Sequence, residues 1–232
     1  MADHPRSLFP AGRRGGRSRT PVAVLGLGRF GRGVALELME SGFEVLGVDA
    51  DERAVQDLNG RLTHVVRADA TDEEALRQLA VHEMERVVVA IGGDLADSIL
   101  AASLMIRFGI EHLWAKANDE RHEEILRQLG VEHVVHPERD MGRRVAHLVS
   151  NSLQDFVAVE NGFAMVRAAA PRRLYGRDLR SLGLAGETGV RVAAMRGAGS
   201  WRYPVGHDVV GPEDTLLLIG PTREVEAFLD EG

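Results

Sequence analysis

Residues 22–31 read Val-Ala-Val-Leu-Gly-Leu-Gly-Arg-Phe-Gly, and this stretch predicts a strand that turns directly into a helix. Its glycines have the spacing Gly-x-Gly-x-x-Gly. Gly26 permits the tight turn, Gly28 lets the backbone approach a pyrophosphate, and Gly31 lets the helix pack closely on the strand. The unpaired N–H groups at the start of the helix, at the positive end of its dipole, then face the phosphates. The stretch therefore predicts a nucleotide site, but it does not by itself predict an enzyme.

A carboxylate at the end of the next predicted strand completes this pattern. Asp49 closes the apolar run 44–49, where its side chain can accept hydrogen bonds from ribose hydroxyls. The same negative charge would repel a 2′-phosphate, so the pattern favours an adenine nucleotide that lacks one. The alternative interpretation is a glycine-rich turn that binds nothing.

The composition is that of an ordinary globular protein. The 232 residues fit one large domain or two modest ones, and 44% of them are hydrophobic. No apolar run approaches the ~20 residues that span a bilayer, and no signal-peptide pattern is present. The chain contains no cysteine, which excludes disulfides, thiolate metal sites and cysteine nucleophiles. We therefore expect a cytoplasmic protein.

The charge is distributed unevenly along the chain. Residues 1–20 contain five arginines against Asp3, a net charge of +4, so the remainder of the chain carries −11 of the total of −7. We interpret residues 1–20 as a disordered basic tail. Contact of this tail with nucleic acid or anionic lipid is the alternative to a simple solvated extension. Because the remainder is acidic, we expect no nucleic-acid partner.

Strand and helix patterns alternate from residue 21 to about residue 152. Strands are predicted at 22–25, 44–49, 64–67, 86–91, 112–116 and 133–136. Such alternation predicts an α/β fold, a doubly wound parallel sheet with helices on both faces. In this Rossmann-like fold the ligand binds at the carboxyl ends of the strands, near the point where the strand order reverses.

Three of the intervening helices carry specific signals. Thr71 and Glu74 have the spacing of a capping box at the start of a helix, and Gly130 is a C-cap signal after the predicted helix 119–129. We expect the helix over 94–107 to be largely buried because it is rich in apolar residues, namely Leu95, Ile99, Leu100, Leu104 and Ile106.

The segments that follow the strands supply the candidate nucleotide contacts. Asp69 and Ala70 lie where an adenine ring would bind, and Gly92 and Gly93 either leave room for a ligand or form a turn. Lys116 ends the fifth strand and provides either a cation near phosphate or a surface charge. The full set of candidates is Gly26, Gly28, Arg29, Phe30, Gly31, Asp49, Ala50, Asp69, Ala70, Thr71, Ile91, Gly92 and Lys116.

A second, smaller module follows. We place the nucleotide-binding domain at 21–137, a linking helix at 138–153 and an α+β module at 154–232. In that module we expect a hairpin around Asn161-Gly162, a short helix over 178–182, strands over 190–195 and 215–219, and a final helix over 221–229. The linking helix has an apolar face that could bridge to the next domain, contact a neighbouring subunit or pack within its own domain.

Several segments together resemble a known family. Val24-Leu-Gly-Leu-Gly-Arg-Phe-Gly31, Asp69-Ala-Thr71, Ala115-Lys-Ala117 and His136-Pro-Glu-Arg-Asp-Met-Gly142 occur in this order. In this combination residues 21–229 resemble the cytosolic regulatory subunits of Trk/Ktr potassium-uptake systems, whose fold is the regulator-of-K⁺-conductance (RCK) domain. The resemblance implies a peripheral protein on the inner face of the membrane.

The resemblance also implies a mechanism. Such subunits form octameric rings of dimers beneath a membrane potassium channel and bind ATP, ADP or NAD(H), ATP favouring the conducting state and ADP the closed one. The residue matching Arg29 reaches the terminal phosphate of a nucleotide in a partner subunit, which suits a guanidinium. The carboxylate matching Glu138 helps to hold a Mg²⁺ or similar cation, which prefers oxygen ligands.

Other interpretations are weaker. His133, His136 and Glu138 could form a metal site, but residues three apart on a strand face opposite sides, so we expect structural histidines. Many family members bind cyclic di-AMP in the last domain; residues 185–189 depart from that pattern, and we do not predict it. An NAD-dependent oxidoreductase would need a placed proton donor, and a transcriptional repressor would need a DNA-binding helix pair. Neither is evident in the sequence.

Overall fold

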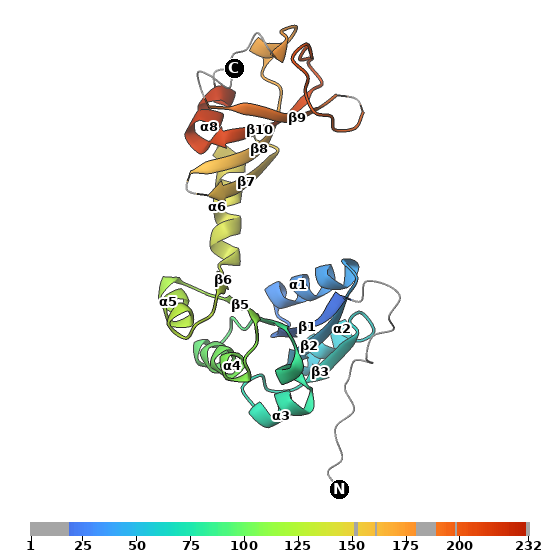
Figure 1. Ribbon diagram of the computed structural model, residues 1–232, viewed down its shortest axis with the longest axis vertical. Coiled ribbons are helices and arrows are strands. Elements are labelled where there is room, and N and C mark those ends of the chain that lie inside the picture. Colours follow the sequence, from blue (N-terminus) through green and yellow to red (C-terminus); the bar gives the residue numbers. More distant parts are fainter. Residues whose placement is uncertain (1–18, 151–152, 161, 180–188, 198, 231–232) are drawn as a thin grey trace. The chain divides into compact units, whose positions relative to one another are not determined.

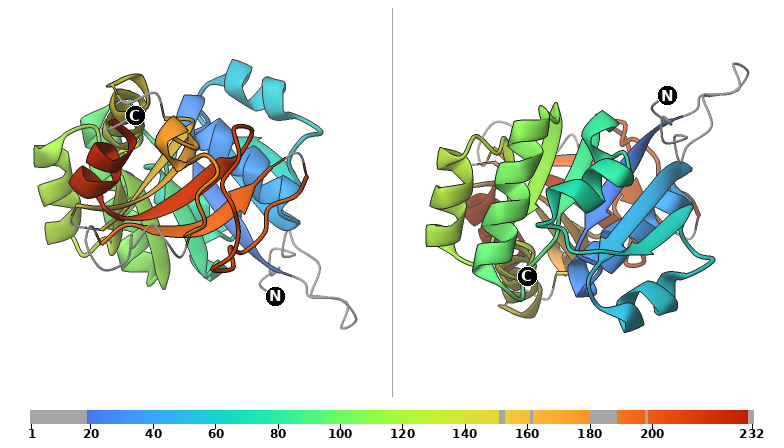
Figure 2. Two further views of the ribbon diagram at one scale, coloured as in Figure 1. Left: turned by 90° about the horizontal axis from the view of Figure 1, so that it is seen from above. Right: turned by 90° about the horizontal axis from the view of Figure 1, so that it is seen from below.

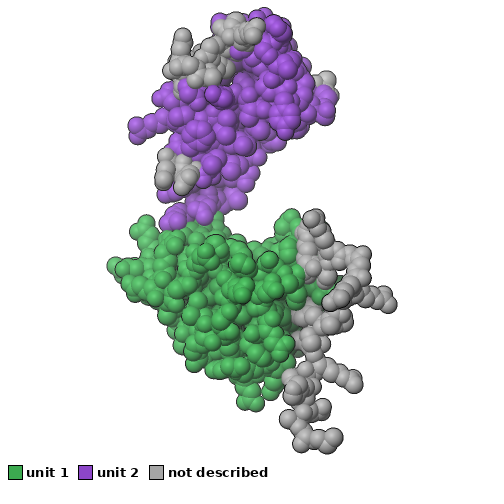
Figure 3. Space-filling model, in the orientation of Figure 1, with its two compact units in different colours: residues 1–137 green, residues 138–232 purple. Residues whose placement is uncertain are grey.

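The chain divides into two compact units, residues 1–137 and 138–232 (Figure 3). The structure is a computed structural model, and it describes residues 19–150, 153–160, 162–179, 189–197 and 199–230. The predicted tail up to residue 18 therefore lies outside the described residues. No helix in the described ranges is long and apolar enough to cross a membrane.

The first unit is built on a six-stranded parallel sheet of order β3-β2-β1-β4-β5-β6. The order reverses at β1, which pairs with β2 on one side and β4 on the other, so the predicted doubly wound sheet is confirmed. The strands are β1 (Arg19–Leu25), β2 (Phe43–Asp49), β3 (His64–Arg67), β4 (Arg86–Val89), β5 (His112–Lys116) and β6 (His133–Val135).

Helices cover both faces of this sheet (Figures 1 and 2). Along β1, Val22 and Val24 join the apolar cluster beneath α1 and α2, whereas Ala23 and Leu25 join the cluster beneath the remaining helices. This period of two is what a strand buried on both faces requires. The helices are α1 (Arg29–Glu40), α2 (Glu52–Leu58), α3 (Glu73–Gln78), the short 3₁₀ helix η1 (Val81–Glu83), α4 (Leu95–Phe108) and α5 (Glu120–Gln128).

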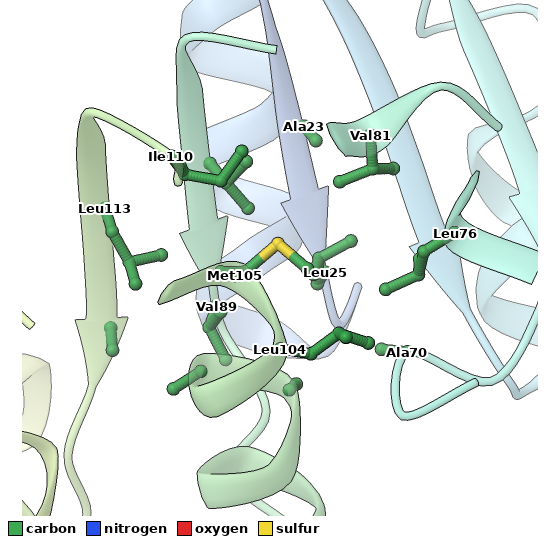
Figure 4. Close-up of a cluster of buried hydrophobic side chains, with 14 of the residues drawn as sticks. Ala23, Leu25, Ala70, Leu76, Val81, Val89, Leu104, Met105, Ile110 and Leu113 are labelled. Carbon is green, nitrogen blue, oxygen red and sulfur yellow. The ribbon is translucent and has the colours of Figure 1, made fainter. Parts of the chain in front are cut away.

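The larger cluster is centred on α4 (Figure 4). Met105 of α4 is fully buried among side chains of β1, β4 and β5, including Leu25, Val89 and Leu113. Burying each such side chain contributes about 1.5–3 kcal/mol. The cluster therefore fixes α4 against the strands whose carboxyl ends form the site described below.

The expectation that α4 is largely buried is wrong for its outer face. Its buried residues are Ser98, Ala101, Ala102, Leu104 and Met105, whereas Leu95 and Leu100 are 48% and 55% exposed. The buried face of α4 thus combines three small residues with Leu104 and Met105, whereas Leu95 and Leu100 lie outside it. An apolar surface therefore remains on α4.

The predicted capping box at Thr71 is also wrong. Asp72 is the N-cap of α3, and its carboxylate accepts hydrogen bonds from the N–H groups of Glu74 and Ala75. Thr71 instead donates its hydroxyl to Asp69. An aspartate is as good an N-cap as a threonine, so the helix begins one residue later. At the end of α5, Gly130 has φ +98°, as the C-cap signal predicts.

The second unit contains an antiparallel sheet of order β7-β8-β10-β9. Its elements are α6 (Pro137–Ser150), β7 (Asp155–Glu160), β8 (Phe163–Ala169), the 3₁₀ helix η2 (Arg172–Leu174), β9 (Arg191–Arg196), β10 (Thr215–Pro221) and α8 (Thr222–Asp230). The hairpin of β7 and β8 and the α+β character are as predicted. Most of the expected helix over 178–182 lies outside the described residues, and Asp178 forms a β-bridge with Val209.

Polar contacts join the end of α6 to this sheet. Arg144 forms an ion pair with Asp155 at 2.6 Å, and His147 bonds Glu226 of α8 at 2.6 Å while its ring stacks on Phe156. The apolar face of α6 remains exposed in the chain at Met141, Val145 and Val149.

Candidate functional site

A cleft of about 370 Å³ lies at the carboxyl ends of β1, β2, β3 and β4. This is the edge of the sheet where doubly wound folds bind their ligands. The described residues that line it are Gly26, Gly28, Val48, Asp49, Ala50, Asp69, Ala70, Thr71, Ala90, Ile91, Gly92, Gly93, Asp94 and Asp97. Nine of the residues named from the sequence are therefore brought together here.

The glycine turn after β1 needs its glycines for two different reasons. Gly26 has φ +93°, and a Cβ there would lie 3.0 Å from the backbone of Ala90 and Ile91. A Cβ on Gly31 would lie only 1.9 Å from the carbonyl oxygen of Gly26. The turn therefore packs tightly against both the end of β4 and the first turn of α1.

The start of α1 is open to the cleft. Gly28 is the N-cap of α1, and a Cβ there would meet nothing within 4 Å. No acidic side chain lies in the first turn of this 12-residue helix. Its unpaired N–H groups and the positive end of its dipole are therefore available to an anion.

The two residues between the second and third glycines point to different environments. Arg29 is exposed, and its side chain forms no hydrogen bond or ion pair with the described residues. Phe30 packs with Val34 and Leu38 in the cluster beneath α1, and it does not line the cleft. The spacing of four residues between Phe30, Val34 and Leu38 places all three on one face of α1, so the Phe30 side chain belongs to the core.

Asp49 is tied to the glycine turn. Its Oδ2 accepts a hydrogen bond from the Leu27 N–H at 2.5 Å, and its Oδ1 accepts one from the Asp51 N–H at 2.8 Å. The neighbouring Ala50 carbonyl accepts from Arg67. The carboxylate thus fixes the turn as well as presenting oxygen atoms to the cleft, a second role that the sequence pattern does not reveal.

The turn after β3 forms another wall. Asp69 accepts hydrogen bonds from both the N–H group and the hydroxyl of Thr71, at 2.8 and 2.7 Å. These bonds, the backbone one first, lower the pKa of Asp69 below its ordinary value, against a smaller opposing effect of burial. Ala70 is buried beside them. The wall therefore presents an ionised carboxylate next to a small apolar surface.

Lys116 lies behind the cleft. It is 9% exposed and does not line the cleft, but its Nζ lies 3.0 Å from where a Cβ on Gly92 would be. Asn118, which sequence reasoning missed, donates from Nδ2 to the Gly92 carbonyl at 3.0 Å. The signal in the sequence was that Asn118 lies two residues after the end of β5, at the edge of the sheet where the cleft lies. Asp94 and Asp97 were also missed as lining residues; Asp94 caps α4.

The candidate metal residue belongs to the other unit. Glu138 is exposed in the first turn of α6. His133 stacks on Trp114 with ring centroids 4.7 Å apart, and buried His136 bonds Glu123 at 2.6 Å. Each histidine thus has a protein partner, and the described residues contain no group of three or more His, Cys, Asp or Glu side chains that could hold a metal ion.

Comparison with known proteins agrees with this geometry. The TrkA-N domain model matches residues 22–137. The chain is 36% identical over 208 residues to the Ktr system potassium uptake protein C of Bacillus subtilis, covering 89% of this chain and 94% of that protein. The chain belongs to the Ktr/Trk family of potassium uptake proteins. It is also 35% identical over 201 residues to the Ktr system potassium uptake protein A of Vibrio alginolyticus, covering 86% and 91% of the two chains.

Solved structures show the same fold for this Ktr-family chain. It aligns with the GsuK channel bound to NAD with a TM-score of 0.64 at 17% identity, over 97% of this chain and 41% of that one. The GsuK RCK domain aligns with a TM-score of 0.63 at 16% identity, over 99% and 50%. The RCK fold is therefore shown, and the Ktr relatives are named as potassium uptake proteins.

Proposed function

We propose that this chain is the nucleotide-responsive regulatory subunit of a potassium-uptake channel or transporter. The observation that carries the proposal is the cleft at the open N-terminus of α1, in a chain whose relatives are Ktr potassium uptake proteins. Helix N–H groups would hold phosphates, Asp49 would accept the ribose hydroxyls, and the wall after β3 would contact adenine.

Arg29 gives the site a means to distinguish ATP from ADP. Two ligands can shift a ring between conducting and closed shapes only if they bind those shapes with different affinity. In the proposed assembly Arg29 of one subunit contacts the γ-phosphate held by its partner. Its exposure and the absence of a side-chain partner among the described residues support this role. ADP lacks the γ-phosphate, so it cannot stabilise the same state.

A divalent cation would accompany the nucleotide. Glu138 would supply one carboxylate ligand, and the phosphate oxygens would supply others, because Mg²⁺ binds oxygen atoms and retains several waters.

Assembly follows from the same proposal. We infer a homo-oligomer, four dimers in an octameric ring, that binds the cytoplasmic side of the membrane subunit. The exposed Leu95 and Leu100 on α4, and Met141 and Val145 on α6, support contacts between subunits, because such apolar surface marks interaction sites.

NAD(H) is the second candidate ligand. The GsuK channel, which has the same fold, has been solved bound to NAD, and Asp49 is compatible with a dinucleotide without a 2′-phosphate. In that case the chain is an NAD(H)-sensing regulator or an NAD-dependent oxidoreductase. Mass spectrometry of the nucleotide that co-purifies with the full assembly separates these ligands, and hydride transfer to a small substrate would support the enzyme.

Calorimetric titration of the Arg29→Ala variant with ATP and ADP tests the mechanism. We expect ATP affinity to fall about tenfold to a hundredfold, as for loss of one charged contact, with ADP little changed. Arg32→Ala is the matched control, because Arg32 on the same helix pairs with Asp57 at 3.1 Å. Equal losses for both nucleotides would refute the role of Arg29.

For Glu138→Gln we expect a weaker Mg²⁺ dependence of ATP binding.

A further inference from the structure

The wall of the cleft after β4 is held by a contact from the turn after β5. Gly92 and Gly93 line the cleft, and neither has a side chain that could pack against its surroundings. Asn118, two residues beyond the end of β5, donates from Nδ2 to the Gly92 carbonyl at 3.0 Å. Because glycines adopt many backbone conformations, a contact of this kind helps to determine where the wall lies.

Asn118 is in turn fixed by His122, which lies in the first turn of α5. The Asn118 N–H donates to Nδ1 of His122 at 3.2 Å, and the His122 N–H donates to the Asp119 carboxylate at 2.8 Å. A ring nitrogen of histidine accepts a hydrogen bond only when it carries no proton. The contact with Asn118 therefore specifies a neutral His122 whose single ring proton is on Nε2.

The surroundings of His122 oppose a second proton on its ring. The residue is 1% exposed, and its buried Nε2 has no hydrogen-bond partner among the described residues. A proton on Nδ1 would set two donors, the Nδ1–H and the Asn118 N–H, against each other, and it would bury a charge without an acceptor. The imidazolium therefore does not fit the closed turn, and protonation of His122 requires the turn to open.

The charges that act on the His122 ring come from α5 and from the end of β6. Burial is the main effect, and it lowers the pKa of His122 below 6.5. The Asp119 carboxylate on α5 acts in the opposite direction, whereas the charge of a protonated His136, after β6, adds to the lowering. His136 itself bonds Glu123 at 2.6 Å. The closed turn therefore contains a neutral His122 at pH 7, and protonation begins only at acidic pH.

We propose that Asn118 and His122 form a proton-sensitive clasp that holds the Gly92 wall of the cleft in its nucleotide-binding position. Both are positioning residues, because neither is among the described residues that line the cleft and His122 acts through Asn118. Protonation of His122 releases Asn118, the wall moves, and the cleft loses affinity for its nucleotide. By linkage, a nucleotide that binds the closed cleft makes His122 harder to protonate by the same factor. The inference rests on the proposed function and adds its regulation by pH.

The size of the effect follows from the uptake of a single proton. Below the pKa of His122 in the nucleotide-free protein, the affinity can fall by at most about tenfold per pH unit. That pKa lies below 6.5. Between pH 7.5 and pH 5.5 we therefore expect the clasp to lower ADP affinity about threefold to tenfold.

Calorimetric titration with ADP at these two pH values tests the clasp in the full-length protein, its His122→Gln variant and a matched His112→Gln variant. Glutamine offers an acceptor oxygen to the Asn118 N–H but takes up no proton. His112 lies at the start of β5, whereas Asn118 follows its end. ADP takes up a proton of its own in this range, so each protein is judged by the ratio of its affinities at the two pH values.

We expect the wild type and His112→Gln to share one ratio, and the ratio of His122→Gln to be about threefold to tenfold smaller. Equal ratios in the wild type and His122→Gln would overturn the proposal, as would an equally reduced ratio in His112→Gln. If His122→Gln does not fold, Asn118→Ala carries the test, because it removes the link to Gly92. An Asn118→Ala variant that keeps the wild-type ratio would overturn the clasp.

NMR of the ligand-free wild type tests the clasp without a nucleotide. The amide signal of Gly92 should titrate together with the His122 ring, whereas that of Gly42, exposed in the turn after α1, should not. A Gly92 signal that does not follow His122 would overturn the proposal. Wild-type protein whose Gly92 signal follows His122 but that binds ADP at neither pH would instead refute the proposed function.

Discussion

Replacing Gly31 by alanine should separate the first turn of α1 from the end of β1. The added Cβ would lie 1.9 Å from the Gly26 carbonyl oxygen, whereas carbon and oxygen approach to about 3.3 Å in ordinary close contacts. The two segments must therefore move apart by about 1.4 Å, the difference between these distances. The obstacle is backbone, so no side-chain rotation relieves it.

This displacement should reduce both stability and binding. Overpacking of a tightly packed contact costs about 1–3 kcal/mol of unfolding free energy. The same movement shifts Gly28 and the helix N–H groups that we assign to the phosphates. A misplacement of about 1 Å costs on the order of a hundredfold in a preorganised site, so we expect ADP affinity to fall between tenfold and a hundredfold.

Gly33 provides the matched control within the same helix. It is exposed, and a Cβ there would meet nothing within 4 Å. Gly33→Ala should therefore stabilise the helix by about 0.5–1 kcal/mol and leave binding unchanged. Urea unfolding of the first unit is followed by Trp114 fluorescence in a Trp201→Phe background, since these are the two tryptophans of the chain. ADP binding is measured by calorimetry.

The reasoning would be refuted by a Gly31→Ala variant that binds ADP like the wild type. It would equally be refuted if Gly31→Ala and Gly33→Ala had the same effect on unfolding free energy. A loss of binding without a loss of stability would show that the helix moves freely, and would contradict the tight packing seen at Gly31.

Three further predictions concern the first unit. Asp72→Ala should cost about 1 kcal/mol of unfolding free energy in urea, because it removes the cap of α3; a larger loss for Thr71→Val would contradict this cap. Thr71→Val should also raise the pKa of Asp69, measured by NMR titration, since the variant lacks the hydroxyl whose hydrogen bond helps to lower that pKa. In the wild type, the lowered pKa stabilises the folded unit above pH 3.8, the ordinary pKa of the group, and this stabilisation is lost as the pH falls below 3.8. Burial lowers the pKa of His122 below 6.5, although the charge of Asp119 acts in the opposite direction. The unfolded chain therefore binds a proton at His122 more tightly than the folded chain does. The unit should lose stability as pH falls through 6.5, and His122→Gln should flatten that dependence in urea midpoints measured from pH 8 to 5.5.

The sequence predicted the sheet because each strand is a short apolar run bounded by turn residues. The positions of Gly26, Gly28 and Asp49 at one edge follow from strand order, because the carboxyl ends of parallel strands meet there. Local sequence patterns were therefore enough to predict the strands and the edge of the sheet where the site lies.

Contacts between segments that are distant in the sequence could not be predicted from these local patterns. Nothing near Asn118 in sequence indicates that it bonds Gly92, 26 residues away. The neighbours of Phe30 in the sequence predict a nucleotide contact, whereas in the structure its side chain packs in the cluster beneath α1. Similarly, the exposure of Leu95 and Leu100 depends on which face of α4 contacts the sheet, and periodicity in a helix this rich in apolar residues does not specify that face.

The walls of the cleft come from separate turns, each attached to its own strand, and this makes the site modular for protein engineering. The turn after β3, with Asp69 and Thr71, could be exchanged to change the preferred base without altering the turn after β1. The turn after β4, with Gly92 and Gly93, forms another wall that could be changed separately. A library that varies one turn at a time should therefore yield sensors for different nucleotides on one unchanged scaffold.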